Sequence, residues 1–500
     1  MSTLLGYIVG EASVSKAVFI SNTAPRRGQY VELNYAGTRV LGMVQALIHG
    51  SVSITEDVHD PDIVRKIRNM SDGTDLYLKG VISILGDTDT LKVPDVPPPP
   101  GTEVYSASKE LLSKVFGESL AKSRRGIRLG VLISEPDVPV YLDVNRLVSR
   151  HLAILAVTGA GKSNTVAVLS DRIVELGGSV VIFDMHSEYD ELEFPSGGEV
   201  NKLAPRINPL HMSTSELLRL LRIDAAAHKQ ERYFRRVWQE VKKKSRSGGT
   251  GEDLLKTASK ILENLLSSED KPSSDKSSIL GVINKIEDFA DRYGDIIDYG
   301  LPDVTVQIKP KTANILDLGS LDEETADALV SHYLRRILEA RKSYAKGGEG
   351  LRFPVLTVLE EAHILAPRER RTLSKYWIAR IAREGRKFGV GLCLVSQRPK
   401  ALDPEALSQT NNKIILRLVE PSDLRYVQQA SELLSEDLLV QLPSLNVGEA
   451  VVLGMMVKVP ALVRIDEFRG KKGGGDPDIV AEWNAVEDTK YGGEEDLLEV

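Results

Sequence analysis

Cysteine is almost absent from this chain of 500 residues. The single one, Cys393, lies in the apolar run 390–395, so the sequence offers neither an internal disulfide nor a cysteine-based metal site. We interpret Cys393 as a small buried hydrophobe. The sequence shows no N-terminal secretory signal, and no apolar run approaches the ~18 residues that a membrane-spanning helix needs. We therefore expect a cytoplasmic protein without a membrane segment, and the length suggests about three domains.

An overall excess of basic residues is also lacking. The formal net charge is −7, which does not favour nucleic-acid binding by the chain as a whole. The charges are segregated, however. Residues 229–246 contain eight basic and two acidic residues, whereas residues 476–500 contain nine acidic residues and one lysine. A basic surface can thus coexist with an acidic total, although a solvated helix face explains residues 229–246 equally well.

The first part of the chain is rich in strand-forming residues. Runs of β-branched and aromatic residues at 30–35, 40–48 and 76–85 predict a small barrel or sandwich. A proline-rich connector follows at 93–101, and the next residues predict one helix over 106–120 and a strand over 127–133 that is a candidate to return to the barrel. We therefore assign residues 1–135 to an N-terminal β-barrel domain with a proline-rich linker.

Farther along, apolar strands alternate with helices. This order predicts an α/β fold with a parallel sheet that is covered on both faces. The strand signal disappears between 209 and 300, where amphipathic stretches predict a helical insertion. The expected units are a core of 136–208, the insertion at 209–300, a second core part at 301–466 that ends in a late hairpin, and a flexible acidic extension at 467–500.

The string AVTGAGKS occupies residues 156–163, between a short apolar strand and a helix. That context is typical of a phosphate-binding P-loop, because glycines let backbone N–H groups turn toward phosphate oxygens. Lys162 can reach the terminal phosphates, and Ser163 can offer its hydroxyl to Mg²⁺. Ala156 replaces the first glycine of the usual motif and is small enough for this position. The expected ATP contacts are Thr158, Gly159, Ala160, Gly161, Lys162, Ser163 and Asn164.

Hydrolysis of the bound nucleotide needs further groups at neighbouring strand ends. Two carboxylates follow the apolar residues 354–359. Glu360 is the candidate acid on the Mg²⁺ side, and Glu361 is the candidate general base for the attacking water. Gln397 ends the next apolar strand and is a candidate sensor of the γ-phosphate, while a strand-end amide that faces solvent is the open alternative.

Asp184 ends a further apolar strand and begins the string DMHSEY. We expect Asp184 to help bind the nucleotide or its Mg²⁺, with Glu188 close by. Hydrogen bonding inside the turn is an equally weighted alternative.

Three arginines recur at three-residue spacing before the strand that ends in Gln397. Arg380, Arg383 and Arg386 are expected near one face of a helix. A nucleotide held between subunits needs a cation from the neighbour to neutralise charge that develops on the γ-phosphate. We therefore assign these arginines to catalysis in trans, and a solvated basic face or DNA contacts remain the alternatives.

Together these strings resemble the HerA branch of the HerA–FtsK superfamily of DNA-translocating P-loop ATPases. The resemblance is carried by SRHLAILAVTGAGKS at 149–163, DMHSEY at 184–189, LEEAH at 359–363 and GRKFGVGLCLVSQRP at 385–399. Ser187 stands where the family usually has glycine. The resemblance covers the ATPase core and the general layout, and it is weakest over the helical insertion and the acidic tail.

The resemblance implies a RecA-like core in a homohexameric ring, with ATP and Mg²⁺ between neighbours and Arg150 as a further nucleotide contact. It implies sequence-independent translocation of duplex DNA. It also implies work with a NurA-type nuclease, and with Mre11–Rad50, in archaeal DNA-end resection for double-strand break repair by recombination. Two alternatives stay open, a motor for protein or conjugative secretion and a nucleotide-gated scaffold that loads a nuclease.

Overall fold

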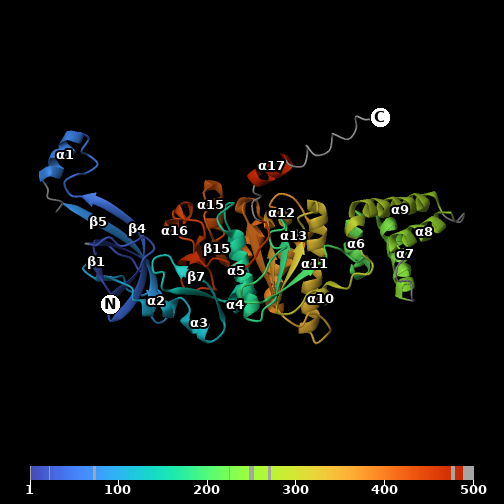
Figure 1. The fold of residues 1–500 in the computed structure, drawn as a ribbon, viewed down its shortest axis with the longest axis horizontal. Helices are drawn as coiled ribbons and strands as arrows, with labels where there is room; N and C mark the ends of the chain where they lie inside the picture. Colours follow the sequence, from blue (N-terminus) through green and yellow to red (C-terminus); the bar gives the residue numbers. More distant parts are fainter. Residues whose placement is uncertain are drawn as a thin grey trace, which may run out of the picture.

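The computed structural model describes all residues except 1, 22, 71–74, 225, 247–252, 268–271, 475–478 and 488–500. Figure 1 shows an elongated molecule with a barrel at one end, a sheet with helices in the middle and a helical bundle at the other end. None of the helices in the described part combines the length and apolar character that crossing a membrane requires.

The N-terminal strands form the predicted barrel. It is closed in the order β1-β2-β5-β4-β3-β6. The strands are β1 (Leu4–Ile8), β2 (Lys16–Ser21), β3 (Tyr30–Tyr35), β4 (Thr38–Ser51), β5 (Leu76–Asp87) and β6 (Glu103–Ser106). Alternate residues such as Phe19, Leu33 and Ile82 are fully buried inside it, as the period of two in a strand requires. The β4–β5 hairpin projects from the barrel and carries α1 (Pro61–Met70) near its tip (Figure 1).

Two expectations for the link from barrel to core were wrong. The single helix expected over 106–120 is two, α2 (Lys109–Val115) and α3 (Glu118–Lys122), because Gly117 between them is left-handed with φ +111°. The strand expected at 127–133 is β7 (Gly126–Leu132), and it joins the core sheet, not the barrel. It pairs with β8 (Pro139–Asp143) and with the C-terminal strand β17, whose distance in sequence hides this pairing from local patterns.

The core is a sheet of 11 strands in the described part of the chain, in the order β11-β12-β10-β13-β14-β9-β15-β16-β17-β7-β8. The first seven are parallel, as expected, and the remaining four extend the sheet in antiparallel fashion. Their bounds are β9 (Leu152–Leu155), β10 (Val180–Asp184), β11 (Glu199–Leu203), β12 (Thr312–Asp317), β13 (Val355–Leu359), β14 (Val390–Ser396), β15 (Asn412–Ile415), β16 (Glu449–Leu453) and β17 (Ala461–Ile465). The predicted late hairpin is β16–β17.

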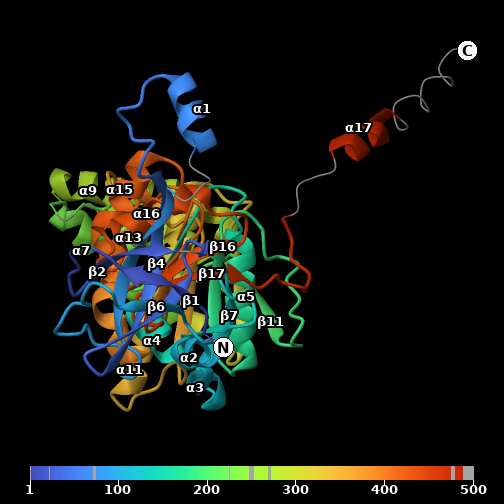
Figure 2. The same cartoon turned by 90° about the vertical axis from the view of Figure 1, so that its left-hand side faces the viewer.

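Helices cover both faces of this sheet. The chain moves from β9 to β10 in one direction along the strand order and from β12 through β13 to β14 in the other. Because such crossovers are right-handed, α5 (Lys162–Glu175) lies on one face, whereas α11 (Glu323–Ala345) and α13 (Leu373–Glu384) lie on the opposite face. Figure 2 shows α5 on one side of the sheet and α11 and α13 on the other.

The expected helical insertion is present. It contains α6 (Thr214–Leu220), α7 (His228–Arg246), α8 (Leu254–Leu266) and α9 (Ser273–Tyr293). Ser213 and Glu216 form a reciprocal capping box at the start of α6. Ion pairs attach the insertion to the core, since Glu216 binds Arg335 of α11 at 2.7 Å, and Glu324 of α11 binds Arg292 of α9 at 2.8 Å.

The shorter helices are α4 (Val144–Arg150), α10 (Val304–Gln307), α12 (Ala362–Leu365), α14 (Pro404–Gln409), α15 (Pro421–Gln429), α16 (Glu436–Leu439) and α17 (Ile479–Glu487). The expectation of a flexible region from 467 onward was wrong for its first residues, which pack on the core. Phe468 meets the ring of Phe194 edge-on at 6.3 Å, and the N–H of Glu193 donates to the Lys471 carbonyl at 2.9 Å. The acidic end at 488–500 lies outside the described residues.

Candidate nucleotide site

The P-loop lies between β9 and α5. Gly159 and Gly161 take left-handed conformations with φ +75° and +105°, which a side chain would strain. Two neighbouring strand ends fix the start of the loop, because the N–H of Ala156 donates to Ser396 and that of Val157 donates to Arg417. The loop is exposed at Thr158 and Gly159. The tip of the loop therefore faces solvent, just before the N-terminus of α5, where helix geometry favours anions.

A glutamate on the neighbouring loop contacts the P-loop serine. The Ser163 hydroxyl donates a short hydrogen bond to the Glu188 carboxylate. Glu188 follows β10 within residues 184–189, the loop expected to lie near Mg²⁺. A serine hydroxyl and a carboxylate are oxygen donors of the kind that Mg²⁺ takes beside phosphate oxygens and waters. The residues present therefore fit a magnesium nucleotide.

Asp184 forms its hydrogen bonds within the turn that follows β10, and the structure shows no contact between its side chain and the P-loop among the described residues. Its side chain is fully buried. Its oxygens accept the backbone N–H groups of Glu188 at 3.0 Å and Tyr189 at 2.8 Å. Burial raises the pKa of this carboxyl, although those hydrogen bonds oppose the rise. The turn-bonding alternative therefore describes Asp184, whose contacts hold Glu188 against Ser163.

Glu360 is 5% exposed at the end of β13. The Tyr189 hydroxyl donates to one of its oxygens at 2.5 Å. Burial raises the pKa of Glu360 to about 8, and the nearby charges of Glu188 and Glu361 add to the rise. The two candidate metal ligands, Ser163 and Glu360, therefore have different partners. Ser163 contacts the carboxylate of Glu188, whereas Glu360 is bonded to the Tyr189 hydroxyl.

Glu361 is also buried, but its pKa is lowered. Burial raises the pKa of Glu361, but the contact with His363 and the charge of Lys162 lower it by more. The backbone of Glu361 is left-handed, with φ 43° and ψ 45°. Such a conformation costs about 1 kcal/mol or more in a residue with a side chain and clusters at functional sites. The lowered pKa keeps Glu361 ionised, and a general base must be ionised to accept a proton from water.

His363 is a site residue to which we gave no role from the sequence. Its Nδ1 lies 3.1 Å from the Glu361 carboxylate and 3.3 Å from the Ser396 hydroxyl. It therefore orients the candidate base from the side of β14. The available signal was its position two residues after that base in the string LEEAH.

Two further predicted residues meet different partners. The Thr158 hydroxyl donates to the Gln397 side-chain oxygen at 2.5 Å, so this strand-end amide is joined to the P-loop. Asn164 does not turn toward the loop. Its amide donates to the Asp466 carbonyl at 3.0 Å and accepts the Phe468 N–H at 2.8 Å. Asn164, which the sequence predicts to contact the nucleotide, therefore anchors the segment after β17 to the start of α5.

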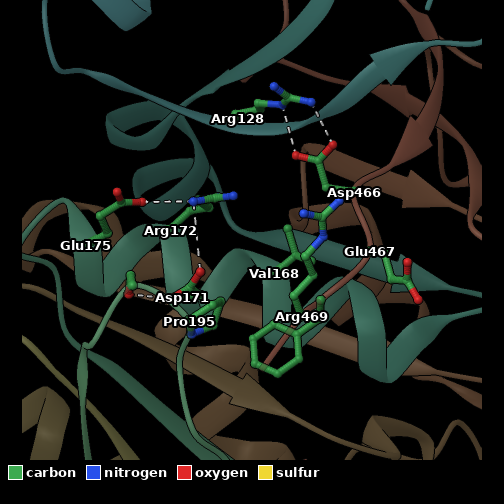
Figure 3. A pocket seen from close by; sticks show the side chains of 11 residues that line it. Arg128, Val168, Asp171, Arg172, Glu175, Pro195, Asp466, Glu467 and Arg469 are labelled. Atoms are coloured by element: carbon green, nitrogen blue, oxygen red, sulfur yellow. Dashed lines mark hydrogen bonds and ion pairs between the residues drawn. The ribbon is translucent and has the colours of Figure 1, made fainter. Parts of the chain in front are cut away.

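That segment borders a cavity of about 530 Å³ behind α5. Arg128 of β7 forms a bidentate ion pair with Asp466, with Nε 2.9 Å from one carboxylate oxygen and Nη2 3.0 Å from the other (Figure 3). Arg172 of α5 contacts Glu175 at 3.1 Å on the opposite wall (Figure 3). The pairing of Arg128 with Asp466 joins the sheet edge to the segment that braces Asn164.

Two of the predicted arginines, Arg150 and Arg386, lie at the opposite end of the strands from the P-loop of their own chain. The helix α13 ends at Glu384, so Arg386 belongs to the following 3₁₀ turn, Gly385–Phe388, not to the same helix as Arg380 and Arg383. This turn precedes β14, and Arg150 ends α4 just before β9. Both sites are at the opposite end of the strands from the P-loop, about 13 Å away along a four-residue strand. Arg150 therefore does not contact the nucleotide of its own subunit.

The arginines differ in their partners. Arg380 lies 3.4 Å from Glu384, and Arg383 forms a 2.7 Å ion pair with Glu405. Within the described part of the chain, Arg150 and Arg386 form no side-chain ion pair.

A buried histidine connects the two arginine-bearing segments. His151, 2% exposed, accepts the Leu392 N–H at Nδ1 at 3.0 Å. Its Nε2 lies 3.1 Å from the Ala382 carbonyl. Since Nδ1 accepts, the neutral ring carries its proton on Nε2 and donates it to Ala382. Burial lowers the pKa of His151 to about 4, which keeps the ring neutral near pH 7. Arg150 and the turn with Arg386 are thus held in one rigid unit.

Comparison with known proteins agrees with this architecture. The family described as "Helicase HerA, central domain" matches residues 127–337, and "HAS barrel domain" matches residues 5–89. "DNA double-strand break repair helicase HerA" of Sulfurisphaera tokodaii is 45% identical over 97% of both chains, and that of Saccharolobus solfataricus is 42% identical over 97% of both. The solved structure of VirB4 of Thermoanaerobacter pseudethanolicus is similar in fold, with 19% identity and a TM-score of 0.50 over 68% of this chain and 96% of that one.

Proposed function

The chain belongs to the family of HerA helicases, and from this premise we propose that it is an ATP-hydrolysing motor that moves duplex DNA during double-strand break repair. Two relatives named as double-strand break repair helicases align with nearly the whole chain. The observation that carries the proposal is Glu361, a buried carboxylate just after β13 that His363 contacts at 3.1 Å. A protein that only switches with nucleotide does not need a water-activating base in this position.

Each site residue has a different role in the hydrolysis of ATP. Lys162 and the P-loop N–H groups would hold the phosphates of ATP, and Ser163 with Glu188 would hold the magnesium ion. That ion, when bound, neutralises charge on the phosphate oxygens. Glu361 orients a water and accepts its proton, while His363 keeps the carboxylate in place. Gln397, joined to Thr158, is placed to respond to the γ-phosphate. Glu360 supports the loop through Tyr189.

The arginine positions favour a ring. Arg150 and Arg386 lie away from their own P-loop, so each can serve only a nucleotide of another subunit. A contact that joins one face of a subunit to the opposite face of the next is heterologous, and such contacts form a ring when the rotation from one subunit to the next closes on itself. We propose six subunits, with Arg386 as the principal cation in trans and Arg150, Arg380 and Arg383 in support.

The partners follow from the resemblance. We propose a NurA-type nuclease, together with Mre11–Rad50, as the machinery that uses the DNA movement in end resection. DNA contacts to the phosphate backbone alone would make this movement independent of sequence and sensitive to salt.

A DNA-stimulation assay tests the proposal. We expect blunt duplex DNA to raise the ATP turnover of intact rings and the rings to displace a third strand from a triplex. Rings of the expected mass that hydrolyse ATP without any response to DNA would favour a secretion motor. Rings that bind ATP but do not hydrolyse it, with or without DNA, would favour the nucleotide-gated scaffold.

A further inference from the structure

A second cavity lies beside the candidate base. It has a volume of about 590 Å³ and is lined by the loops after β13 and β14 and by the start of α15. His363, the residue that orients Glu361, forms part of its wall. The cavity is therefore adjacent to the hydrolysis site, although none of the expected ATP contacts lines it.

Cations dominate the mouth of this cavity. Four basic side chains line it, against two carboxylates. The basic ones are Arg368, Arg370, Arg398 and Lys400, and the acidic ones are Glu369 and Asp423. Asp423 accepts the backbone N–H of Lys400 at 3.0 Å. Within the described part of the chain, the side chains of Arg398 and Lys400 are exposed and form no ion pair. Two mobile cations at the edge of an open cavity are suited to phosphate oxygens.

Short polar contacts connect the backbone of these cations with the candidate base. The backbone N–H of Arg398 donates to the Ser396 hydroxyl at 3.1 Å. Ser396 lies 3.3 Å from His363, which lies 3.1 Å from Glu361. Only two side chains, Ser396 and His363, therefore separate the Arg398 backbone from Glu361.

The other basic region lacks such a connection. The helix α7 lies in the insertion at the far end of the molecule from the barrel (Figure 1). Several of its cations are already paired, Lys229 with Asp275 at 2.8 Å and Arg235 with Glu231 at 2.8 Å. The solvated-face interpretation of residues 229–246 is consistent with these pairs.

We propose that Arg398 and Lys400 bind the phosphate backbone of duplex DNA, and that this contact adjusts Glu361 through Ser396 and His363. The proposal rests on the proposed function, because it assigns contacts to the same DNA substrate. Contact with the backbone alone carries no sequence information. Arg368, stacked on Tyr426 at 5.5 Å, borders the same mouth and adds positive charge there.

The binding part is tested with Arg398→Ala/Lys400→Ala in the full chain. Duplex affinity is measured at several salt concentrations. Each lost phosphate contact lowers the slope of log affinity against log salt by about 0.9, so the double variant should lose about 1.8. The matched control is Lys309→Ala/Lys346→Ala, which removes two exposed lysines from the segments that precede the N-terminal ends of β12 and β13. A slope equal to that of the control would overturn the assignment.

The connection is tested with Ser396→Ala. We expect its salt slope to match the wild type while the ratio of kcat with DNA to kcat without DNA falls toward one. KM for ATP should stay constant, and Ser396→Thr should restore the ratio. A wild-type ratio in Ser396→Ala would refute the connection.

The two levels of the proposal fail in different ways. If wild-type rings show no response to DNA, the proposed function itself is wrong. If the wild type responds and Arg398→Ala/Lys400→Ala keeps the full slope, only the location of the DNA contact is wrong.

Discussion

Single residues at the nucleotide site depend on buried partners for their position. Asp184 holds the turn that brings Glu188 to Ser163, and Ser187 in this turn is left-handed with φ +57°. Glycine adopts that conformation without strain, which explains why the family usually has glycine there. The Ser187 hydroxyl donates to Asp317 at 2.8 Å, and this contact offsets part of the cost in this chain.

The role of Glu361 leads to the first prediction. Glu361→Gln keeps the size of the side chain but cannot accept a proton from water. We expect ATP to bind with near wild-type affinity, while kcat falls by about 100-fold or more. Filter binding and steady-state turnover measure the two quantities. Lys162→Ala should lose both, since it removes a phosphate contact. Normal hydrolysis by Glu361→Gln would refute the assigned role.

The contact between Ser163 and Glu188 leads to a second prediction. Glu188→Gln removes a charged oxygen donor beside the serine, so the Mg²⁺ concentration for half-maximal turnover should rise about 10-fold. The matched control is Glu191→Gln on the same loop, where the carboxylate pairs with Lys471 at 3.0 Å. If Glu360→Gln shifted the Mg²⁺ dependence and Glu188→Gln did not, the metal ligand would be Glu360.

Among the elements, the junction of α4, α13 and β14 is the one that local patterns do not reveal. The regular spacing of Arg380, Arg383 and Arg386 suggested one continuous helix, but the helix ends before Gly385. A side chain on Gly385 would meet the Val390 carbonyl at 2.4 Å. The chain therefore turns tightly into β14 at this glycine, and the turn places Arg386 just before the N-terminal end of β14.

His151 makes this junction sensitive to acid. Its folded pKa of about 4 lies below the value of 6.5 in an unfolded chain. The stability it contributes is therefore complete above pH 6.5 and is lost as the pH falls toward 4. Between pH 7 and 4.5 we expect the wild type to lose about 2 kcal/mol more than His151→Asn, at 1.36 kcal/mol per pKa unit. Urea unfolding of both proteins at the two pH values measures the difference. Equal losses would show that His151 titrates normally.

At the scale of the whole molecule, the core sheet separates the P-loop from the candidate arginines Arg150 and Arg386. The P-loop and the start of α5 follow the C-terminal end of β9, whereas Arg150 and Arg386 precede the N-terminal ends of β9 and β14. Helix α13, which carries Arg380 and Arg383, lies on the face opposite α5 (Figure 2). One subunit therefore presents a nucleotide at one surface and cations at another. We propose that a second copy of the chain completes the site.

Mixed rings test this division. Arg386→Ala and Lys162→Ala should each be inactive alone, but mixing them creates some sites with an intact P-loop and an intact arginine from the neighbour. We expect partial recovery of turnover that depends on the mixing ratio. The control mixture, Glu361→Gln with Lys162→Ala, should not recover, because both changes disable the same subunit's half of the site. Absence of recovery in the first mixture, with exchange of subunits demonstrated by mass, would argue against shared sites.

Much of the fold was accessible from the sequence. The barrel, the parallel strands, the helical insertion and the late hairpin each follow from runs of residues with a regular period. The pairing of β7 with the core sheet could not be predicted, because its partner β17 is more than 300 residues away in the sequence. The local sequence of each strand shows only that the strand is apolar and does not specify its partner. The packing of Phe468 on Phe194 was missed for the same reason.

What the sequence determined by itself is the nucleotide chemistry. The P-loop, the carboxylates after β13 and the amide after β14 are local strings, and their geometry follows from adjacent residues. Only the tertiary structure decided that Glu188 and not Asp184 contacts Ser163, that His363 orients Glu361, and that Arg150 is remote from its own P-loop. The direction of a side chain at a strand end depends on loop dihedrals and on neighbours brought together by sheet pairing, and no local string encodes those.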